Sequence, residues 1–439
     1  MGARNLKLVK FIKLVVPILL ISFLFSGCSF HISSSLDELI TPISPFGEDA
    51  KISEALDDYA KKYTLKTCIN GNYTSSFVKK DLNGDGKSEA IVFYEPSDAL
   101  GTVNMALLAV RDGKWQVTSS IVGKGSDVSE ISFCDLTGNG QENILVSWEV
   151  ISNNSNYILS IYSYSSAEDG FELSVLNEDL SFSKYTTADL NNDNLNEVLI
   201  FNTPSSDSGS SSAVLYSFKN NAKKKLGSTK LDSNITSYSN ITVDKSDDNG
   251  AVVYADAVKG QNSMITEIVY WSDKHDTIIS PFYDYKTGVT KETYRSNTIT
   301  CRDIDGDKSI EIPMDCDDAS VPSQLKLINW KTYGNYVLFH KQYSVLNDKD
   351  GYFLSVDDKV FKNTYPMYDE KNRELTVKDK ENDKILFSLK TVFKAEYSED
   401  AFGGYQMLYE KAPFCYLVSV QKNEYDISYE YIKQNFTEY

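Results

Sequence analysis

Short apolar runs recur along the chain, and each begins directly after a loop rich in acidic and amide residues. The runs are Ala-Ile-Val-Phe-Tyr at 90–94, Ile-Leu-Val-Ser-Trp at 144–148, Val-Leu-Ile-Phe at 198–201 and Ile-Pro at 312–313. Runs rich in β-branched and aromatic residues favour strands. The loops begin at residues 81, 135 and 189, a spacing of 54 residues, and a further copy begins at 303. This periodicity predicts a β-rich repeat protein.

A second feature follows each acidic loop by about 30 residues: a strand-like run, a tight turn and another strand. The turns are Asp112-Gly113, Asp169-Gly170, Asn220-Asn221, Asp273-Lys274 and Gly334-Asn335. Asp-Gly and Asn-Asn steps favour hairpins because these residues tolerate positive φ. A worn copy of the loop at Asp244–Gly250 brings the count to five units. Four short strands per unit predict a β-propeller of about five four-stranded blades.

The regions flanking the repeats differ from them in pattern. Apolar residues at helical spacing predict a short helix over 52–63, and a strand near 64–69 could close the ring or start another blade. The acidic loops stop near residue 345. Beyond it the patterns predict strands at 351–356, 374–378, 384–392 and 414–420 and a helix at 428–436. We therefore expect a propeller over 48–344 and a small α+β domain over 345–439.

The N-terminus has the pattern of a secretion signal. Residues 1–27 carry four Lys or Arg and no acidic residue, and then an apolar run at 14–25 leads to Ser-Gly-Cys28. This run is short for a membrane span, so a signal peptide is favoured over an uncleaved anchor helix. The Cys after Ser-Gly resembles the lipobox of bacterial lipoproteins, which implies lipidation of Cys28 and a cell-surface location. Residues 28–47 are expected to be a tether.

The charge balance excludes some partners. The formal net charge is −18, and removing residues 1–27 would leave 40 Lys and Arg against 62 Asp and Glu. Such a chain lacks the basic footprint that nucleic acids require, but it can neutralise charge with cations. The five cysteines after Cys28 have no metal-ligand spacing, although Cys301 and Cys316 could pair. With three histidines in the sequence, a histidine-based site is not expected.

The acidic loops follow the pattern D-x-[ND]-x-[DN]-G-x-x-[ED]. Side-chain oxygens at positions 1, 3, 5 and 9 and the carbonyl of position 7 can converge on one Ca²⁺, which takes six to eight oxygens at about 2.3–2.6 Å. The expected ligands are Asp81, Asn83, Asp85, Lys87 and Glu89; Asp189, Asn191, Asp193, Leu195 and Glu197; and Asp303, Asp305, Asp307, Ser309 and Glu311. We therefore expect about two or three structural Ca²⁺ ions.

Two loops are weaker candidates, and other interpretations compete. The second loop offers Asp135, Thr137, Asn139 and Asn143, a single charged ligand, and the fourth is expected to bind nothing. Lys308 stands at the glycine position of the fifth loop.

An EF-hand would need Glu at position 12 and an exiting helix, and a dockerin would need copies about 22 residues apart. An Asx-rich turn without metal remains the alternative. Gly86-Lys87-Ser88 is no P-loop, because the preceding glycine is missing and carboxylates flank it.

The first, third and fifth loops resemble the calcium-binding turns of FG-GAP/VCBS repeats, which lie between blade strands of integrin-type propellers. Oxygen spacing and the following strand agree in all three. The whole mature chain resembles the lipid-anchored FG-GAP/VCBS-repeat proteins of Clostridia-like Gram-positive bacteria. This resemblance implies a surface location and a propeller, but no activity.

Three functions are compatible with these features. We expect a protein without enzymatic activity: a calcium-stiffened recognition or adhesion module for a glycan, peptide or envelope partner, held at the membrane through Cys28. The alternative is a polysaccharide hydrolase or lyase using a pair of carboxylates outside the metal loops. The third is an assembly lipoprotein whose C-terminal domain docks on another envelope component. Some of the many aromatic residues could form a stacking platform for sugars, but the sequence does not identify them.

Overall fold

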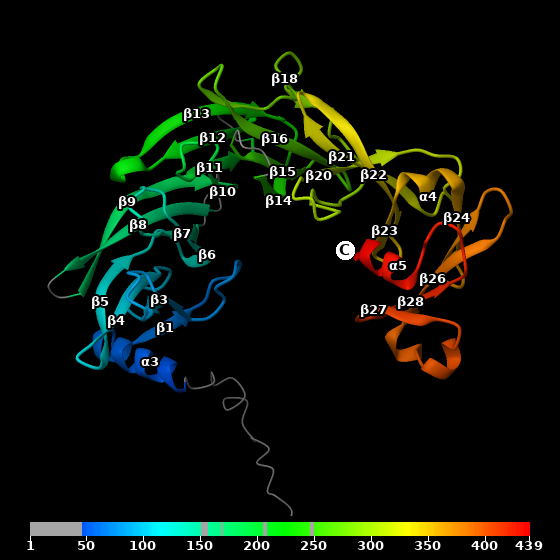
Figure 1. Ribbon diagram of the computed structural model, residues 1–439. Coiled ribbons are helices and arrows are strands. Elements are labelled where there is room, and N and C mark those ends of the chain that lie inside the picture. Colours follow the sequence, from blue (N-terminus) through cyan, green and yellow to red (C-terminus); the bar gives the residue numbers. More distant parts are fainter. Residues whose placement is uncertain (1–45, 151–156, 168–169, 205–208, 246–249) are drawn as a thin grey trace, which may run out of the picture. The chain divides into compact units, whose positions relative to one another are not determined.

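A computed structural model describes residues 46–150, 157–167, 170–204, 209–245 and 250–439 (Figure 1). The predicted signal peptide, the lipidation site Cys28 and most of the tether lie outside these residues. The chain divides into two compact units, Met1–Ser53 and Glu54–Tyr439. No helix in the described part of the chain is long and apolar enough to span a membrane.

The described strands form antiparallel sheets, as the repeat pattern predicts (Figure 1). The first sheet contains β1 (Tyr63–Lys66), β2 (Phe77–Lys80), β3 (Glu89–Pro96), β4 (Asn104–Arg111) and β5 (Lys114–Val122). The second contains β6 (Asp127–Cys134), β7 (Asn143–Glu149), β8 (Tyr157–Ala167) and β9 (Gly170–Phe182). The third contains β10 (Lys184–Ala188), β11 (Glu197–Asn202), β12 (Ser211–Ser217) and β13 (Lys224–Leu231).

Three further sheets and a small hairpin follow. The fourth sheet contains β14 (Ser237–Asp244), β15 (Val252–Val258), β16 (Met264–Ser272) and β17 (Thr277–Ile279), and the hairpin pairs β18 (Tyr283–Asp284) with β19 (Val289–Thr290). The fifth contains β20 (Glu311–Cys316), β21 (Lys326–Gly334), β22 (Val337–Asn347), β23 (Tyr352–Val356) and β29 (Phe436–Glu438). The sixth contains β24 (Thr364–Asp369), β25 (Glu374–Asp379), β26 (Ile385–Phe393), β28 (Phe414–Val420) and β27 (Gln406–Lys411).

Helices are few. Those in the described residues are the α-helices α3 (Glu48–Tyr59), α4 (Asp358–Asn363) and α5 (Tyr429–Asn435). The helix predicted at 52–63 is thus shifted by four residues, and β1 follows where the strand near 64–69 was expected. Short α4 and α5 are each capped by a side chain: Asp357 accepts from the Val360 N–H, and Ser428 accepts from the Tyr431 N–H.

The predicted hairpins are confirmed where the structure describes them. Asp112 and Gly113 both have positive φ, 50° and 77°, in the two-residue turn between β4 and β5. The turns containing Asn220, Asp273 and Asn335 join β12 to β13, β16 to β17 and β21 to β22. Asp169 lies outside the described residues.

Consecutive sheets share hydrophobic cores. Phe93 of β3 meets Trp148 of β7 edge to face, with ring centroids 5.8 Å apart. Leu199 of β11 belongs to the same buried cluster as Val253 of β15. Burial of one such side chain contributes about 1.5–3 kcal/mol, so these clusters are the main attraction between neighbouring repeats. The mainly β, antiparallel part of the prediction is therefore confirmed. No sheet among the described strands closes on itself.

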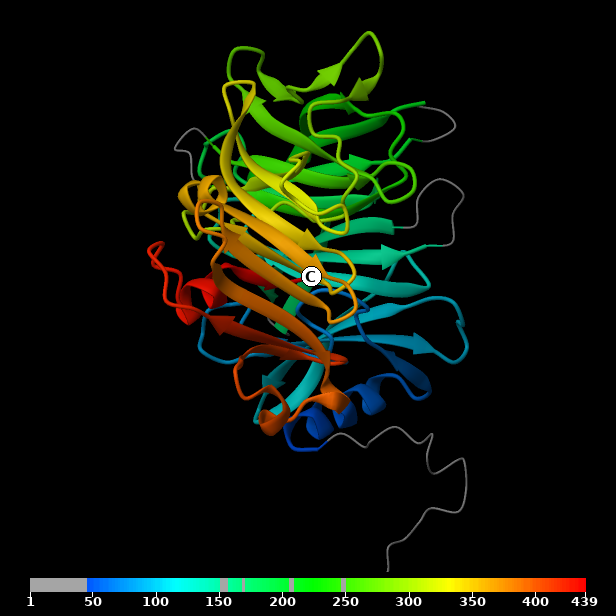
Figure 2. The ribbon, with the colours of Figure 1, turned by 90° about the vertical axis from the view of Figure 1, so that its right-hand side faces the viewer.

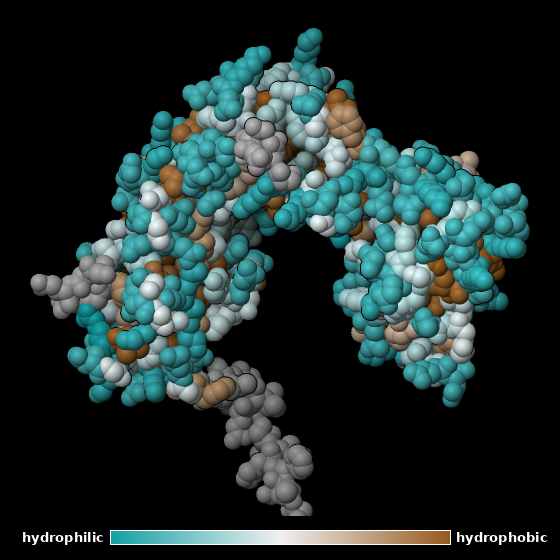
Figure 3. Space-filling view, in the orientation of Figure 1, coloured by the Kyte–Doolittle hydropathy of each residue, from teal (hydrophilic) through white to brown (hydrophobic). Residues whose placement is uncertain are grey.

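The C-terminal region continues the fifth sheet. The predicted domain boundary at 345 falls inside β22, which pairs with β23, and β23 in turn pairs with β29. The sixth sheet, drawn in orange and red in Figure 2, is therefore inserted between β23 and β29. The predicted strands correspond to β23, β25, β26 and β28, and the closing helix to α5. On the face in Figure 3 the surface is mostly hydrophilic, in keeping with the negative net charge.

Candidate metal-binding loops

The acidic loops occupy equivalent places in successive sheets. Loop 81–89 joins β2 to β3, loop 135–143 joins β6 to β7, and loop 189–197 joins β10 to β11. Loop 303–311 leads into β20, and Asp244 ends β14 at the start of the worn fourth copy. Residues 246–249 of that copy lie outside the described residues.

The first aspartate organises each of the four well-formed loops. Asp81 accepts the N–H groups of Gly84 (2.7 Å) and Gly86 (2.9 Å). Asp135 accepts the N–H groups of Gly138 and Gly140 in the same way. Asp303 accepts those of Gly306 and Lys308. Asp189 accepts from Asp193 and Asn194 instead. A carboxylate that accepts backbone N–H groups bends the chain around itself, so the repeat pattern encodes one turn four times.

Side chains at positions 3 and 5 tighten the same turn. Asn83 accepts the Asp85 N–H at 2.8 Å, and Asp85 accepts the Lys87 N–H at 2.8 Å. In the third loop Asn191 accepts the Asp193 N–H and Asp193 accepts the Leu195 N–H. In the fifth loop Asp305 accepts the Asp307 N–H and Asp307 accepts the Ser309 N–H. In the second loop Asn139 accepts from Gln141, while Thr137 donates to Asp135.

The glutamate at position 9 reaches back from the strand into the loop. One oxygen of Glu89, Glu197 and Glu311 accepts the N–H of position 2, at 2.9, 3.1 and 3.1 Å. The Glu197 and Glu311 side chains belong to fully buried residues, and the other oxygen, Oε1, of each has no hydrogen-bond partner. A buried acceptor without a partner is costly, and it is rare in native proteins. These two oxygens therefore require an explanation.

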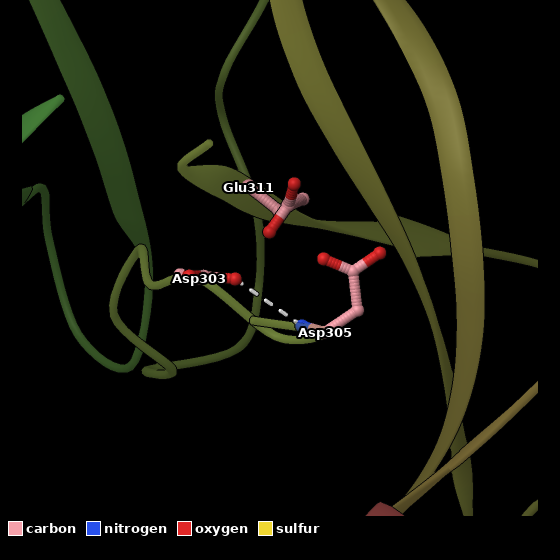
Figure 4. A group of neighbouring side chains, drawn as sticks. All are labelled: Asp303, Asp305 and Glu311. Atoms are coloured by element: carbon pink, nitrogen blue, oxygen red, sulfur yellow. Dashed lines mark hydrogen bonds between the residues drawn. The ribbon is translucent and has the colours of Figure 1, made fainter. Parts of the chain in front are cut away.

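The fifth loop brings its carboxylates closest together. Asp303, Asp305 and Glu311 each offer an oxygen within 4.8 Å of the others, and Figure 4 shows them around one point. Within the described residues this is the one group of three His, Cys, Asp or Glu side chains that meets this spacing. In the first and third loops position 3 is an asparagine, so one fewer carboxylate is available there.

Lysines that the sequence analysis missed lie beside two loops. Lys341 of β22 contacts Asp305 at 2.9 Å and also contacts Asp307. Lys219 lies 3.3 Å from Asp193. Both lysines come from the hairpin of the same unit, about 30 residues beyond the loop. The repeat itself was visible in the sequence, but the bend of that hairpin toward the loop was not.

Burial shifts the pKa of the position-9 glutamates. Desolvation raises the pKa of Glu197 to about 7, and neighbouring aspartates add to the shift. Desolvation likewise raises the pKa of Glu311 to about 7, and it raises that of Glu89. The pKa of Asp307 is lowered by its hydrogen bond with Lys341. Buried carboxyls of this kind are destabilised when ionised unless a cation compensates them.

The second loop keeps the turn but lacks the buried acid at position 9. Asn143 stands at position 9, is buried, and accepts the Leu136 N–H at 2.9 Å, as the glutamates do in their loops. Asp244 accepts the Ile310 N–H at 3.3 Å, which links the worn fourth copy to the fifth loop. The second loop is thus a natural reference for the turn without the buried acid.

Lys308 adopts the left-handed conformation that glycine favours. Its φ is 75°, close to the 82° of Gly86 at the same loop position. Left-handed backbone costs an L-residue about 1–2 kcal/mol, while glycine loses about 0.5–1 kcal/mol more on ordering. Lys308→Gly is therefore expected to stabilise the protein by about 0.5–1 kcal/mol, measured as a higher urea midpoint. A lower midpoint, or an equal gain from Lys87→Gly at position 7, would contradict this.

A second polar cluster lies in the core and was not found from the sequence. Arg295 and Asp256 are fully buried and paired at 2.8 Å. Arg295 also donates to Thr266 (2.8 Å) and to the Ile299 carbonyl (3.1 Å), and Asp256 accepts the Cys301 N–H at 2.8 Å. The Cys301 thiol, whose pKa burial raises, is unpaired, so it forms no disulfide with Cys316. This cluster ties the segment 295–301 to the fourth sheet.

An aromatic pocket of about 420 Å³ lies beside the fourth sheet. Its walls come from the end of β14, the start of β15, β16 and the turn between β21 and β22. Its aromatic lining residues are Tyr254, Tyr270, Trp271, Tyr333 and Tyr336, and its acidic ones are Asp244 and Asp273. The volume falls within the range of small-ligand sites. These residues come from segments that are distant in the sequence, so no local pattern marks them as a platform for sugars.

No protein-family model and no curated protein sequence matches the chain. The similar solved structures include the exotype rhamnogalacturonan lyase YesX (12% identity, TM-score 0.25) and a rhamnogalacturonan lyase from Bacillus licheniformis (13%, 0.29). Each match covers 74% of this chain and 71% of the other. The rhamnogalacturonan lyase YesW matches at 11% identity and a TM-score of 0.29, over 74% of this chain and 69% of the other.

These matches correct one expectation. We expected a protein without enzymatic activity, and the similarity to lyases contradicts this prediction. Because the TM-scores lie below 0.5, no active-site residue is transferred from them to this chain.

Proposed function

We propose that this chain is a calcium-binding β-repeat protein of the FG-GAP/VCBS kind, in which Ca²⁺ fills the first, third and fifth loops and fixes the joins between strands. The observation that carries the proposal is the pair of buried, unpartnered Oε1 atoms of Glu197 and Glu311. Each lies in a loop whose other oxygens come from Asp and Asn side chains, the ligand types that Ca²⁺ prefers. A divalent cation there would compensate both the missing partner and the buried charge.

The proposed ligands are those expected from the loop pattern, with Lys341 and Lys219 as neighbours that compete for the same aspartates. We further propose a propeller-like arrangement of the first five sheets, because the loops at 81–89, 135–143 and 189–197 each join equivalent strands and the loop at 303–311 leads into the fifth sheet. The signal-like sequence before Cys28 supports attachment to the cell membrane through a lipid on that residue, facing outward. The negative charge speaks against nucleic acid as a partner.

A matched pair of variants tests the metal. Asp189→Ala and Asp135→Ala each remove the carboxylate that accepts the N–H of position 6 in its loop, but only the first belongs to a loop with a buried glutamate. We expect Asp189→Ala to reduce the Ca²⁺ bound per protein molecule, counted by metal analysis after dialysis, whereas Asp135→Ala leaves the count unchanged. Equal counts in both variants and the unaltered protein, or no bound Ca²⁺ at all, would overturn the proposal.

The activity that we propose is directed at a polysaccharide, with cleavage as the reaction. The observation that favours it is the pocket that combines aromatic rings with Asp244 and Asp273, since a pair of carboxyl groups is what glycoside hydrolysis requires. Incubation of the protein in Ca²⁺ with a panel of polysaccharides would release reducing ends, the product of hydrolysis. Asp273→Asn is expected to abolish the release. Activity that persists in this variant would exclude the pocket as the reaction site.

A further inference from the structure

The pocket beside β16 has a geometry that limits what it can bind. Tyr270 lines it, and its ring centroid lies 6.1 Å from that of Tyr333 and 6.4 Å from that of Tyr336. Tyr333 also contacts Phe282, edge to face, with ring centroids 5.7 Å apart. Rings packed in this way present a fixed aromatic surface, so little conformational entropy is lost when a ligand covers it.

Tyr336 occupies an unusual backbone position. Asn335 and Tyr336 form the two-residue turn between β21 and β22, with φ of 49° and 64°. The second position of such a turn strongly favours glycine, and a bulky residue there is strained. The Tyr336 side chain is nevertheless 58% exposed, so its ring gains little from burial within the protein. The ring contacts Tyr270, and backbone strain at such an exposed position is common at ligand-binding sites.

The polar groups of the pocket determine which ligand charge it can accept. Asp244 and Asp273 supply carboxylates, and Asn335 supplies an amide. Burial raises the pKa of Tyr270 above its ordinary value, so its hydroxyl stays neutral. No Lys, Arg or His is found among the described residues that line the pocket. An anionic ligand would therefore meet like charge with nothing to compensate it.

We propose that this pocket binds a neutral sugar ring, a hexose or deoxyhexose unit of a polysaccharide, and rejects uronic acid units. The inference rests on the proposed polysaccharide-directed function and names the class of residue that it recognises. The C–H face of the sugar lies against the ring of Tyr336 or Tyr270. Its hydroxyl groups donate to the carboxylates of Asp244 and Asp273 and bond the Asn335 amide. The mixture of flat apolar rings and convergent polar groups matches the two chemical faces of a sugar.

Affinity electrophoresis of the full-length protein in detergent and Ca²⁺ tests this inference. Each gel contains one soluble polysaccharide: galactan, mannan, xylan or mixed-linkage glucan, with polygalacturonate as the anionic comparison. We expect at least one neutral polysaccharide to retard the protein and polygalacturonate not to retard it. Tyr336→Ala should weaken the retardation about fivefold to tenfold, the effect of one aromatic contact. Tyr285→Ala, an exposed tyrosine outside the pocket, should have no effect.

The possible results separate the two proposals. If a neutral polysaccharide binds and Tyr336→Ala binds it equally well, the pocket is not the sugar site, but the polysaccharide-directed function stands. If polygalacturonate alone binds, the charge selection is wrong and the function again stands. If none of the polysaccharides retards the protein, both proposals are wrong. Thermal unfolding of Tyr336→Ala within about 2 °C of the unaltered protein would show that an observed loss of binding is not caused by misfolding.

Discussion

Replacing Glu197 and Glu311 by glutamine lowers the thermal stability of the protein in Ca²⁺ but not in EDTA. Each glutamine keeps an oxygen to accept the N–H of position 2, so the turn survives, while the charged ligand is lost. A site saturated at 100 times its dissociation constant stabilises the folded state by about 2.7 kcal/mol, so each substitution costs about this amount in Ca²⁺. Calorimetric unfolding of the full chain in Ca²⁺ and in EDTA measures the change in melting temperature under each condition.

In EDTA the two substitutions have the opposite effect on stability. Desolvation raises the pKa of both glutamates to about 7, well above the value in an unfolded chain. A group whose pKa is raised by folding is destabilised in its ionised form, so the metal-free protein loses stability as the pH rises from about 4.5 to about 7. Glutamine removes this cost. The double variant is therefore expected to equal or exceed the unaltered protein in EDTA at neutral pH.

Glu267 provides the matched control. It is fully buried and has a pKa raised to about 7, again mainly by desolvation. Both of its oxygens have partners: Oε1 accepts the Asp232 N–H at 2.7 Å, and Oε2 accepts from Ser280 at 3.3 Å and Thr290 at 3.1 Å. Glu267→Gln should change the stability equally in Ca²⁺ and in EDTA. The metal assignment would be contradicted if Glu267→Gln changed the stability more in Ca²⁺ than in EDTA. It would also be contradicted if Glu197→Gln changed the stability equally in both.

The loops were predictable from the sequence, and their surroundings were not. The spacing of Asp81, Asp135 and Asp189 is a local pattern, and each turn closes on its own residues, so nine positions are enough to specify it. The core pair of Arg295 and Asp256 joins residues 39 positions apart, and the tyrosines of the pocket come from separate strands. Contacts of this kind depend on how sheets pack, and a single sequence carries no periodic signal for them.

The domain boundary shows the same limit. The strands after residue 345 were predicted, because alternating patterns mark them one by one. The pairing of β23 with β22, and of β29 with β23, could not be predicted in this way. It depends on which strand edges are free in the folded protein. Strand pairing over such a separation leaves no trace in local composition.

Breaking the buried pair of Asp256 and Arg295 is expected to be the most damaging single change in the core. Arg295 is fully buried and gives five hydrogen bonds to Asp256, Thr266, Thr293 and Ile299. Removing one partner leaves the other as an uncompensated buried charge, which costs about 3–5 kcal/mol. Asp256→Ala should therefore lower the free energy of unfolding by about this amount, measured by urea denaturation.

Two further variants make this prediction specific. Asp256→Leu combined with Arg295→Met removes both charges and replaces them with apolar groups, so it should recover most of the loss. Lys349→Met breaks an ion pair with Glu370 in which both side chains are more than half exposed, and it should cost less than about 1 kcal/mol. A double variant as unstable as Asp256→Ala would show that shape rather than charge determines the stability of this cluster.

The return of β29 to β23 has a consequence for the growing chain. The second, third and fourth sheets are built from consecutive strands, so each can be completed as soon as its last strand has been made. The fifth sheet keeps β23 as an open edge until residues 357–435 have also been synthesised. An unpaired edge is a template for wrong strand pairing. During synthesis, the nascent protein is thus most exposed to misassembly at β23, a strand that carries no part of the acidic repeat pattern.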